Sequence, residues 1–234
     1  MMKGMSTPDG LRIASYNVRK CVGLDRRRRP ERIIEVINAL DADLIALQEA
    51  DRRLGPRPAA IGREMIERET DFAVLDLGGD GPSIGWHGNA ILLRRGLNGG
   101  AVELIALPGT EPRGAVALDV GALRVVATHL GLLRRDRRRQ LDAIARHLGA
   151  RAGRSVILGD FNEWTRRRGL EPLAEAFVVH SPGRSYHAAR PLAALDRVAT
   201  GREIRLQDAG VHDTALSRVA SDHLPIWADL APAA

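Results

Sequence analysis

The residues best suited to chemistry stand at the ends of short apolar segments. They are Asn17, Glu49, His129, Asp160 with Asn162, Asp196, and Asp222 with His223. Carboxylates and carboxamides are costly to bury without partners. If these segments are neighbouring strands, their ends converge on one mouth, and the polar side chains meet there.

The residue types favour chemistry with a hard divalent cation. Glu49, Asp160 and Asp222 offer carboxylate oxygens, which suit magnesium or manganese better than zinc. The chain has one cysteine, Cys21, and no paired-histidine metal motif. His129 and His223 are then available for phosphate contact or proton transfer. Asp196 could orient His223, as a carboxylate orients histidine in hydrolase triads.

Each residue also has an ordinary structural interpretation. Asn17 and Asp222 could cap turns, His129 could be a satisfied core histidine, and Asp196 could pair with Arg197. Taken singly, these interpretations are favoured. Taken together, they must hold independently at every strand end, so the whole set favours a site.

The elements that must position these residues follow from hydrophobic periodicity. Residues 11–18 and 43–49 read as strands, and a helix begins at Pro30 between them. This order predicts a β-α-β unit. A second helix is expected over residues 58–69 and the clearest one over residues 135–148, with Gly149 as its C-terminal cap. Further strands are expected at residues 72–77, 89–93, 115–120, 123–129, 155–158 and 224–230, with two or three short strands within 195–209.

The spacing at the end of the 155–158 strand makes a finer prediction. Asp160 and Asn162 are two residues apart, so in an extended chain both point to one side. Phe161 between them then faces the opposite way, into packing. No linker or repeat is visible, so residues 11–234 are expected to form one domain after a disordered N-terminus at residues 1–10. Many strands and few helices indicate packed sheets with helices outside.

Composition sets limits on the partners. The chain has 234 residues and a net charge of +6, and Lys3 and Lys20 are the only lysines among 35 basic residues. Arginine is well shaped to grip phosphate, although codon usage explains most of this excess more simply. Aromatic residues make up only 3%, which disfavours a surface built to stack many bases. Without a signal peptide, a membrane-spanning run or a second cysteine, we expect a cytoplasmic protein and infer no protein partner.

An ordered series of motifs links the chain to a known family. The sequence resembles the endonuclease/exonuclease/phosphatase superfamily, which includes deoxyribonuclease I, abasic-site endonucleases, sphingomyelinases and inositol polyphosphate phosphatases. The motifs occur in the family's order over residues 11–230. They are Ser15-Tyr16-Asn17-Val18, Leu47-Gln48-Glu49, Gly88-Asn89-Ala90-Ile91-Leu92, Thr128-His129-Leu130, Gly159-Asp160-Phe161-Asn162, Leu195-Asp196-Arg197-Val198 and Ser221-Asp222-His223-Leu224-Pro225.

The resemblance implies a fold and a set of roles. The fold would be α/β of the α+β type, a deoxyribonuclease I-like four-layer sandwich of two packed mixed β-sheets flanked by helices. One or two Mg²⁺ or Mn²⁺ ions would be held by Glu49, Asn17 and Asp222. The catalytic residues would be His129, Asp160, Asn162, Asp196 and His223, and which of them is the general base stays open.

One departure affects the metal and the substrate. Two residues after Asn17, abasic-site endonucleases carry an acidic residue, whereas this chain has Arg19 followed by Lys20. A cation cannot bind magnesium, which puts a second metal beside Asn17 in doubt. Arg19 and Lys20 are therefore predicted to bind the substrate. Asn89 and Arg113 are predicted to line the site as further substrate-binding residues, while Trp86 and His87 are as well explained by loop packing.

Three functions remain. The first is a metal-dependent phosphodiesterase or phosphatase acting on a small or lipid-derived phosphoester. The second is an endonuclease or exonuclease on DNA or RNA, for which the arginine clusters at residues 26–29, 134–139 and 166–168 could follow a phosphate backbone. The third is an inactive relative that only binds a phosphorylated ligand.

Overall fold

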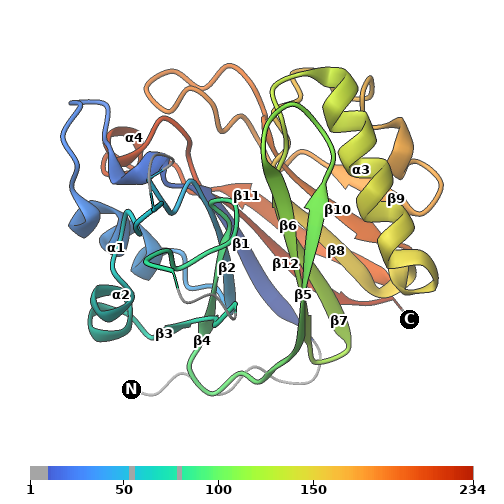
Figure 1. Ribbon diagram of the computed structural model, residues 1–234, viewed down its shortest axis with the longest axis horizontal. Coiled ribbons are helices and arrows are strands. Elements are labelled where there is room, and N and C mark those ends of the chain that lie inside the picture. The colour runs from blue at the N-terminus through green and yellow to red at the C-terminus, as the bar shows by residue number, and fades with distance from the viewer. Residues whose placement is uncertain (1–9, 53–55, 78–80, 234) are drawn as a thin grey trace.

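The computed structural model describes residues 10–52, 56–77 and 81–233, and in these residues two six-stranded sheets pack face to face (Figure 1). Residues 1–9, predicted to be disordered, lie outside the described part. The first sheet has the order β11-β12-β1-β2-β4-β3. Its strands are β11 (Ile204–Val211), β12 (Ile226–Pro232), β1 (Leu11–Asn17), β2 (Leu44–Gln48), β4 (Ala90–Arg94) and β3 (Phe72–Val74).

The second sheet has the order β5-β6-β7-β8-β10-β9. Its strands are β5 (Gly99–Leu107), β6 (Arg113–Val120), β7 (Leu123–His129), β8 (Ser155–Asp160), β10 (Asp196–Gly201) and β9 (Phe177–His180). Both sheets are mixed, because each holds one parallel pair among antiparallel neighbours: β1 with β2 in the first and β7 with β8 in the second. The two parallel pairs end close to each other, because Asn17 at the end of β1 donates a hydrogen bond to Asp160 at the end of β8.

The helices form the two outer layers. Helices α1 (Pro30–Ala39) and α2 (Arg63–Glu69) cover the first sheet, and α3 (Arg134–Leu148) covers the second (Figure 1). Ile13, Leu44, Val125 and Leu158 belong to the apolar core between the two sheets. The predicted four-layer, deoxyribonuclease I-like sandwich is confirmed.

Local sequence explains where the crossover helices start and stop. Helix α1 begins at Pro30, whose fixed φ suits the first helical turn. Its residues Ile33, Ile34 and Ile37 are buried against the first sheet. Helix α3 ends where Gly149 takes a left-handed φ of 50°, which costs glycine little. Each helix connects the two members of a parallel pair, so the chain contains two β-α-β units.

Some boundaries differ from the prediction. Helix α2 begins at Arg63 rather than near residue 58, and β5, β9 and the short α4 (Ser217–Ala220) were not predicted. Strand β5 begins with two glycines and is mostly exposed in its first half, so it lacks an apolar pattern. None of the helices in the described ranges is long and apolar enough to cross a membrane.

The two ends of the chain meet in the first sheet. Strand β1 pairs with β12 antiparallel, and Arg12 makes a two-pronged ion pair with Asp229 at 2.7 Å for both contacts. Near the other end of β1, the Ser221 hydroxyl donates to the backbone oxygen of Asn17 at 2.7 Å. This pairing brings the segment before β12 to the same edge as Asn17.

Candidate active site

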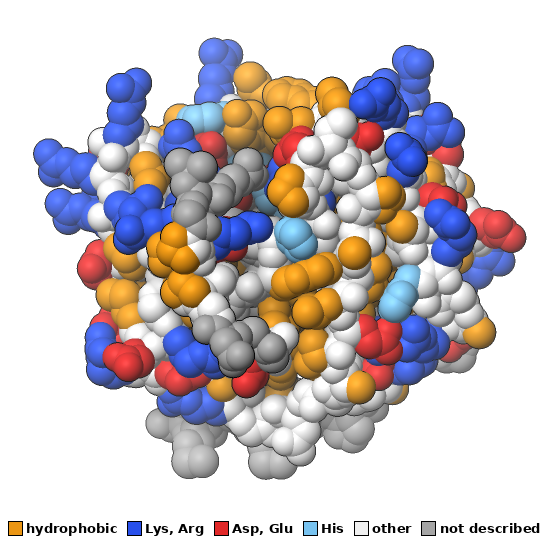
Figure 2. Space-filling view, in the orientation of Figure 1, with side chains coloured by type: hydrophobic (Ala, Val, Ile, Leu, Met, Phe, Trp, Pro, Cys, Tyr) orange, Lys and Arg blue, Asp and Glu red, His pale blue; other side chains and the backbone are white. Residues whose placement is uncertain are grey.

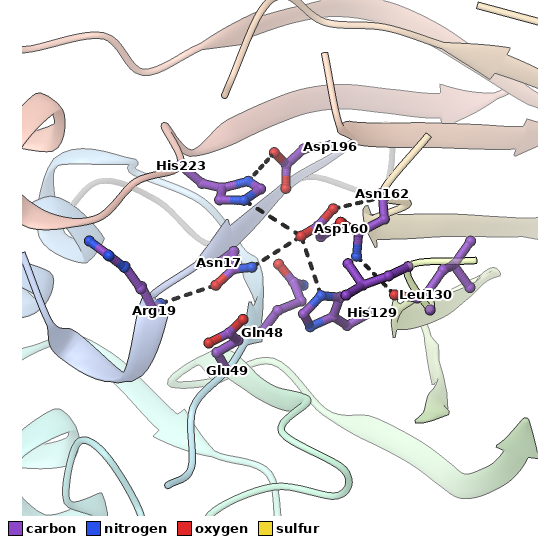
Figure 3. Close-up of polar contacts among 12 residues, drawn as sticks. Asn17, Arg19, Gln48, Glu49, His129, Leu130, Asp160, Asn162, Asp196 and His223 are labelled. Carbon is purple, nitrogen blue, oxygen red and sulfur yellow. Dashed lines mark hydrogen bonds and ion pairs between the residues drawn. The ribbon is translucent and has the colours of Figure 1, made fainter. Parts of the chain in front are cut away.

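Asp160 is the centre of a buried polar cluster at this edge (Figure 3). It is the last residue of β8, and its side chain points between the two sheets. The Asn17 amide donates to Asp160 Oδ2 at 3.1 Å, and the Asn162 backbone N–H donates to Oδ1 at 2.9 Å. The Nε2 atoms of His129 and His223 lie 3.4 and 3.6 Å from Oδ2. Four predicted site residues thus surround a fifth.

His223 is held by a carboxylate on its other nitrogen. Its Nδ1 lies 2.8 Å from Asp196 Oδ2, and the Ser185 hydroxyl donates to that same oxygen at 2.5 Å. Asp196 is the first residue of β10, and the ladder pairs it directly with Asp160 on β8. The contact fixes Nδ1–H toward Asp196 and turns Nε2 toward Asp160. The predicted orientation of His223 by Asp196 is present in the structure.

Asp160 and His223 both have a pKa raised above the ordinary value. Burial raises the pKa of the Asp160 carboxyl above its ordinary value, although His223 opposes part of that rise. Burial alone would lower the pKa of His223, but the Asp196 and Asp160 carboxylates outweigh it and raise its pKa. The imidazole therefore favours its protonated form, which can donate a hydrogen bond to an anion.

Asn162 reaches the cluster through an unexpected backbone conformation. Strand β8 ends at Asp160, and Asn162 has a left-handed φ of 52°. Its side-chain amide donates to the Leu130 carbonyl at 2.9 Å. The extended geometry expected for residues 160–162 is therefore wrong at Asn162, because the strand stops one residue too early. Phe161 is fully buried under α3, as expected.

Glu49 and Asp222, predicted as metal ligands, each hold a basic side chain. Lys20 forms an ion pair with Glu49, and Arg19 Nε lies 3.2 Å from Asp222 Oδ2. Both carboxylates are partly open, with side-chain exposures of 16% for Glu49 and 21% for Asp222. The side-chain oxygen of Asn17 accepts from the Arg19 backbone N–H at 3.0 Å and keeps a second lone pair. Accessible oxygens that already attract cations fit a hard divalent ion.

Another group of ligand types lies close together, namely Asp160, Asp196 and His223. One ligand atom from each falls within 4.8 Å of the others. Both nitrogens of His223 already face these two carboxylates, so a metal between them would displace the contact with Asp196. We therefore interpret this group as a hydrogen-bonded acid–base cluster and keep Glu49, Asn17 and Asp222 as the predicted ligands.

Asn89 and Arg113, predicted to touch substrate, are buried beside the site. Asn89 donates to the Gly114 carbonyl at 3.0 Å and so ties the loop before β4 to β6. Arg113 pairs with Glu111 at 2.8 Å and is 5% exposed. Trp86 stacks edge-on against His87 at 4.4 Å and packs over Gly114, where a Cβ would come within 2.3 Å of the indole ring. Loop packing accounts for these two aromatic residues.

Three supporting residues were not singled out from the sequence. The Ser221 hydroxyl donates to the Asn17 carbonyl, and the Ser185 hydroxyl donates to the Asp196 carboxylate. Gln48, next to Glu49 in the sequence, accepts a hydrogen bond from the Ser15 hydroxyl at 3.2 Å. Ser221 and Gln48 stand inside the family motifs, directly before Asp222 and Glu49, so their place in the sequence held a signal for them. Ser185 stands in a segment without a motif, and only the fold brings it to Asp196.

The fold and the site together define a class. Two mixed sheets packed face to face, with an Asn–Asp–His cluster where their parallel strands end, make a deoxyribonuclease I-like hydrolase fold. The model of the Endonuclease/Exonuclease/phosphatase family matches residues 14–223, and the chain belongs to that family. No curated protein sequence matches it.

Solved structures agree on the fold. An endonuclease/exonuclease/phosphatase from Beutenbergia cavernae is 21% identical, with a TM-score of 0.71 over 96% of this chain and 72% of that one. TDP2 of D. rerio, complexed with a single-strand DNA product, is 17% identical, with a TM-score of 0.70 over 94% of this chain and 98% of that one. The human Nocturnin catalytic domain with bound sulfate is 16% identical, with a TM-score of 0.71 over 96% of this chain and 95% of that one.

Proposed function

We propose that this protein is a divalent-metal-dependent phosphodiesterase or phosphatase acting on a small or lipid-derived phosphoester. The observation that carries the proposal is the convergence on Asp160 of Asn17, His129 and His223, from both sheets. Phosphoryl transfer depends on positioning and on neutralising charge at the phosphate. Neutral amides and a protonated imidazole around the buried Asp160 carboxylate suit that task.

The chain's own residues divide the work. Asp160, whose pKa is raised by burial, is the residue best placed to accept a proton from an attacking water. His223, kept protonated and oriented by Asp196, donates to a phosphate oxygen. Asn17 and Asn162 donate hydrogen bonds without adding negative charge, so they do not repel the phosphate.

The predicted metal would be held by Glu49 and Asp222 with the side-chain oxygen of Asn17. Mg²⁺ or Mn²⁺ bound there would polarise a phosphate oxygen and offset charge on the leaving group. The proposal covers one ion or two at this position. Lys20 and Arg19 now pair with these carboxylates and would have to move aside, and both are about one-third exposed, at 30% and 35%. Once displaced from these carboxylates, Arg19 and Lys20 would be able to contact the substrate, which is the role the sequence predicts for them.

The proposal is tested by turnover of bis-p-nitrophenyl phosphate and a panel of phosphomonoesters and phosphodiesters, with Mg²⁺ and with Mn²⁺. We expect metal-dependent release of p-nitrophenol, abolished by chelation with EDTA. Glu49→Gln should remove the metal-dependent turnover while leaving the melting temperature near that of the wild type, since Glu49 is at a strand end and partly exposed.

A matched control separates the ligand role from general charge effects. Glu203→Gln changes an exposed carboxylate near the start of β11, outside the site, and should keep full turnover. If no member of the panel is hydrolysed with either metal, the inactive-relative hypothesis replaces the proposal. If Glu49→Gln retains wild-type turnover, the metal assignment is wrong.

A nuclease is the second candidate, favoured by the exposed arginines at residues 26–29, which follow the Asn17 strand end. The Arg28 guanidinium donates to the Lys20 carbonyl at 3.1 Å, which holds part of this cluster beside the predicted metal ligands. The single-strand DNA product of the D. rerio TDP2 structure shows that this fold can hold nucleic acid in that protein. Cytoplasmic localisation stays part of the proposal, supported by the single, buried Cys21.

A further inference from the structure

Three loops border the site on the side of the second sheet. Residues 130–133 follow β7, residues 161–170 follow β8, and residues 181–195 lead into β10. Each loop therefore begins or ends at a residue of the polar cluster: His129, Asp160 or Asp196. Whatever contacts these loops lies next to the entrance of the site.

Exposed apolar side chains concentrate on the three loops. Leu132 is 65% exposed, Leu133 47%, Trp164 64% and Leu192 63%. In the described part of the chain, the other large apolar side chains with comparable exposure are Leu104, Val178 and Val219, on β5, β9 and α4. Single exposed apolar residues are ordinary, but four on adjoining loops mark a contact surface. We call Leu132, Leu133, Trp164 and Leu192 the apolar rim.

Hydrogen bonds and ring contacts hold the rim as one surface. The buried Glu163 carboxylate pairs with Arg137 at 2.8 Å, and Arg137 also donates to the Leu132 carbonyl at 2.5 Å. The ring centroid of Trp164 lies 5.9 Å from that of Tyr186. The Leu192 backbone N–H donates to the Tyr186 carbonyl at 2.7 Å. Glu163 is thus linked to the Leu132 loop through Arg137, and Trp164 is linked to the Leu192 loop through Tyr186.

The rim also touches the catalytic cluster through Tyr186. The Tyr186 ring centroid lies 4.9 Å from that of His223 and 5.9 Å from that of Trp164, so Tyr186 contacts both rings. An apolar group seated on Trp164 is therefore two rings away from the imidazole that faces Asp160. The rim and the chemistry are adjacent.

The same loops are strongly basic. Their exposed arginines make no ion pair with any residue in the described ranges; they are Arg166, Arg167, Arg168, Arg184 and Arg190. The only acidic residue in the three loops is Glu163, which is 1% exposed and already paired with Arg134 and Arg137. Figure 2 shows hydrophobic side chains gathered at the top edge of the molecule with basic side chains on both sides. The exposed charges carried by the three loops themselves are therefore all positive, while Glu111 outside them accepts from the Leu132 backbone N–H at 2.9 Å and pairs with Arg113.

We propose that the apolar rim docks on an anionic phospholipid surface, so that the site meets phosphoester head groups in the membrane. Leucine and tryptophan side chains enter the boundary between head groups and acyl chains, while arginines remain at the anionic head groups. Nucleic acid would also satisfy the arginines, but three of the four rim residues are aliphatic and offer no ring for base stacking. The proposal rests on the proposed function for the reaction, but the docking is independent of turnover.

The test is co-sedimentation with vesicles of phosphatidylcholine, alone or mixed with phosphatidylglycerol. We expect the wild type to bind the mixed vesicles and to bind pure phosphatidylcholine much more weakly. The triple variant Leu132→Ser/Leu133→Ser/Leu192→Ser should bind the mixed vesicles at least about tenfold more weakly, because each leucine loses its apolar contact with the bilayer. The variant Arg166→Ser/Arg190→Ser should lose the preference for phosphatidylglycerol.

Matched controls separate docking from folding and from catalysis. Leu104→Ser/Val178→Ser removes two exposed apolar side chains from the middle of β5 and β9 and should bind vesicles as the wild type does. The triple leucine variant should hydrolyse soluble bis-p-nitrophenyl phosphate at the wild-type rate. If the wild type fails to hydrolyse that substrate yet docks through the rim, the proposed function fails and the docking stands.

Several results would overturn the docking. The wild type could bind neither kind of vesicle, or the triple leucine variant could bind the mixed vesicles as tightly as the wild type. A fluorescent single-stranded oligonucleotide serves as the competing ligand. Binding of that oligonucleotide, lost in the triple leucine variant while vesicles are ignored, would reassign the rim to nucleic acid.

Discussion

Four of the nine non-glycine residues with a left-handed φ in the described part of the chain are predicted site residues. Arg19, Lys20, Glu49 and Asn162 have φ values of 45°, 55°, 52° and 52°. Such conformations cost a side-chain-bearing residue about 1 kcal/mol each, and they persist where the surroundings enforce them. Here the enforcement comes from the loops just after β1, β2 and β8.

Asp196 is expected to act on catalysis only through His223. Asp196→Asn should lower kcat for bis-p-nitrophenyl phosphate by about 10² to 10⁴, since the amide cannot stabilise the imidazolium or fix its tautomer. KM should change little, because Asp196 is fully buried behind His223. Steady-state kinetics on the folded variant measure both parameters.

Ser185→Ala serves as the comparison for that change. It removes the Ser185 hydroxyl that donates to Asp196 Oδ2 but leaves the contact between the Asp196 carboxylate and His223. We expect a much smaller loss of kcat than for Asp196→Asn. Equal losses in the two variants, or a kcat for Asp196→Asn within about threefold of the wild type, would contradict the positioning role.

Lys20 is expected to compete with the metal for Glu49. Lys20→Ala removes the ammonium from the carboxylate, and we expect Mn²⁺ to bind about fivefold more tightly, the effect of a partly exposed ion pair. Isothermal titration calorimetry with Mn²⁺ measures this without turnover. Arg205→Ala, at the far end of β11, is the control and should leave the affinity unchanged. Weaker Mn²⁺ binding in Lys20→Ala would show that Glu49 is not the ligand.

At the scale of elements, the two β-α-β units explain why much of the candidate site can be predicted from the sequence. Strands β1, β2 and β7 have clear apolar runs that stop at Asn17, Glu49 and His129, so the polar ends could be recognised. Strands β5 and β9 lie at the two edges of the second sheet; β5 begins with exposed glycines, and β9 has only four residues, with Val178 exposed. Sequence alone also gave no sign that Ser185 would reach Asp196, because a long loop makes that contact.

The loop after β8 depends on one buried carboxylate. Glu163 accepts from Arg134, Arg137 and the Thr165 hydroxyl, at 3.2, 2.8 and 3.0 Å. Burial would raise the pKa of Glu163, but the contacts with Arg137, Thr165 and Arg134 outweigh it and lower the pKa to about 2. The loop that follows Asp160, a predicted catalytic residue, is thus held to α3 by these ion pairs.

This lowered pKa makes a stability prediction with a definite sign. A carboxyl with a folded pKa below its unfolded value contributes stability above the unfolded pKa, near 4.5, which is lost as the pH falls toward 2. Glu163→Gln should therefore cost about 2 kcal/mol at pH 7 and much less near pH 3. Urea denaturation of both proteins at the two pH values measures the difference. A cost equal at both pH values would show that the charge of Glu163 is not what holds the loop.

At the scale of the whole molecule, the net charge of +6 bears on the choice between the two candidate functions. A nuclease that contacts three phosphates would lose about 40-fold in affinity between 50 and 200 mM salt, because counterions are released on binding. For a small phosphoester we expect kcat/KM to change by about twofold or less over that range. Parallel assays on bis-p-nitrophenyl phosphate and on plasmid, single-stranded and abasic DNA decide between them. Faster, steeply salt-dependent cleavage of any of the DNAs would favour the nuclease.

The site is also assembled from residues far apart in the chain. Asn17 and Glu49 come from the first β-α-β unit, His129 and Asp160 from the second, and His223 from the segment before β12. From the sequence, two things alone indicate that these residues meet: the order of the motifs, and the rule that parallel strands end at one edge of a sheet. The contact distances and the pairing of Lys20 with Glu49 depend on loop conformations that no periodicity records.

The pairing of β1 with β12 has a consequence for the synthesis of the protein. A ribosome releases β1 early, but its partner strand and the Ser221 hydroxyl that anchors Asn17 are made about 200 residues later. Until then β1 has an open edge, and contacts this distant in sequence form slowly. The polar cluster around Asp160 therefore cannot be complete early in synthesis, because His223 lies in the segment just before β12. Chaperones that shield strand edges are expected to raise the yield of active protein.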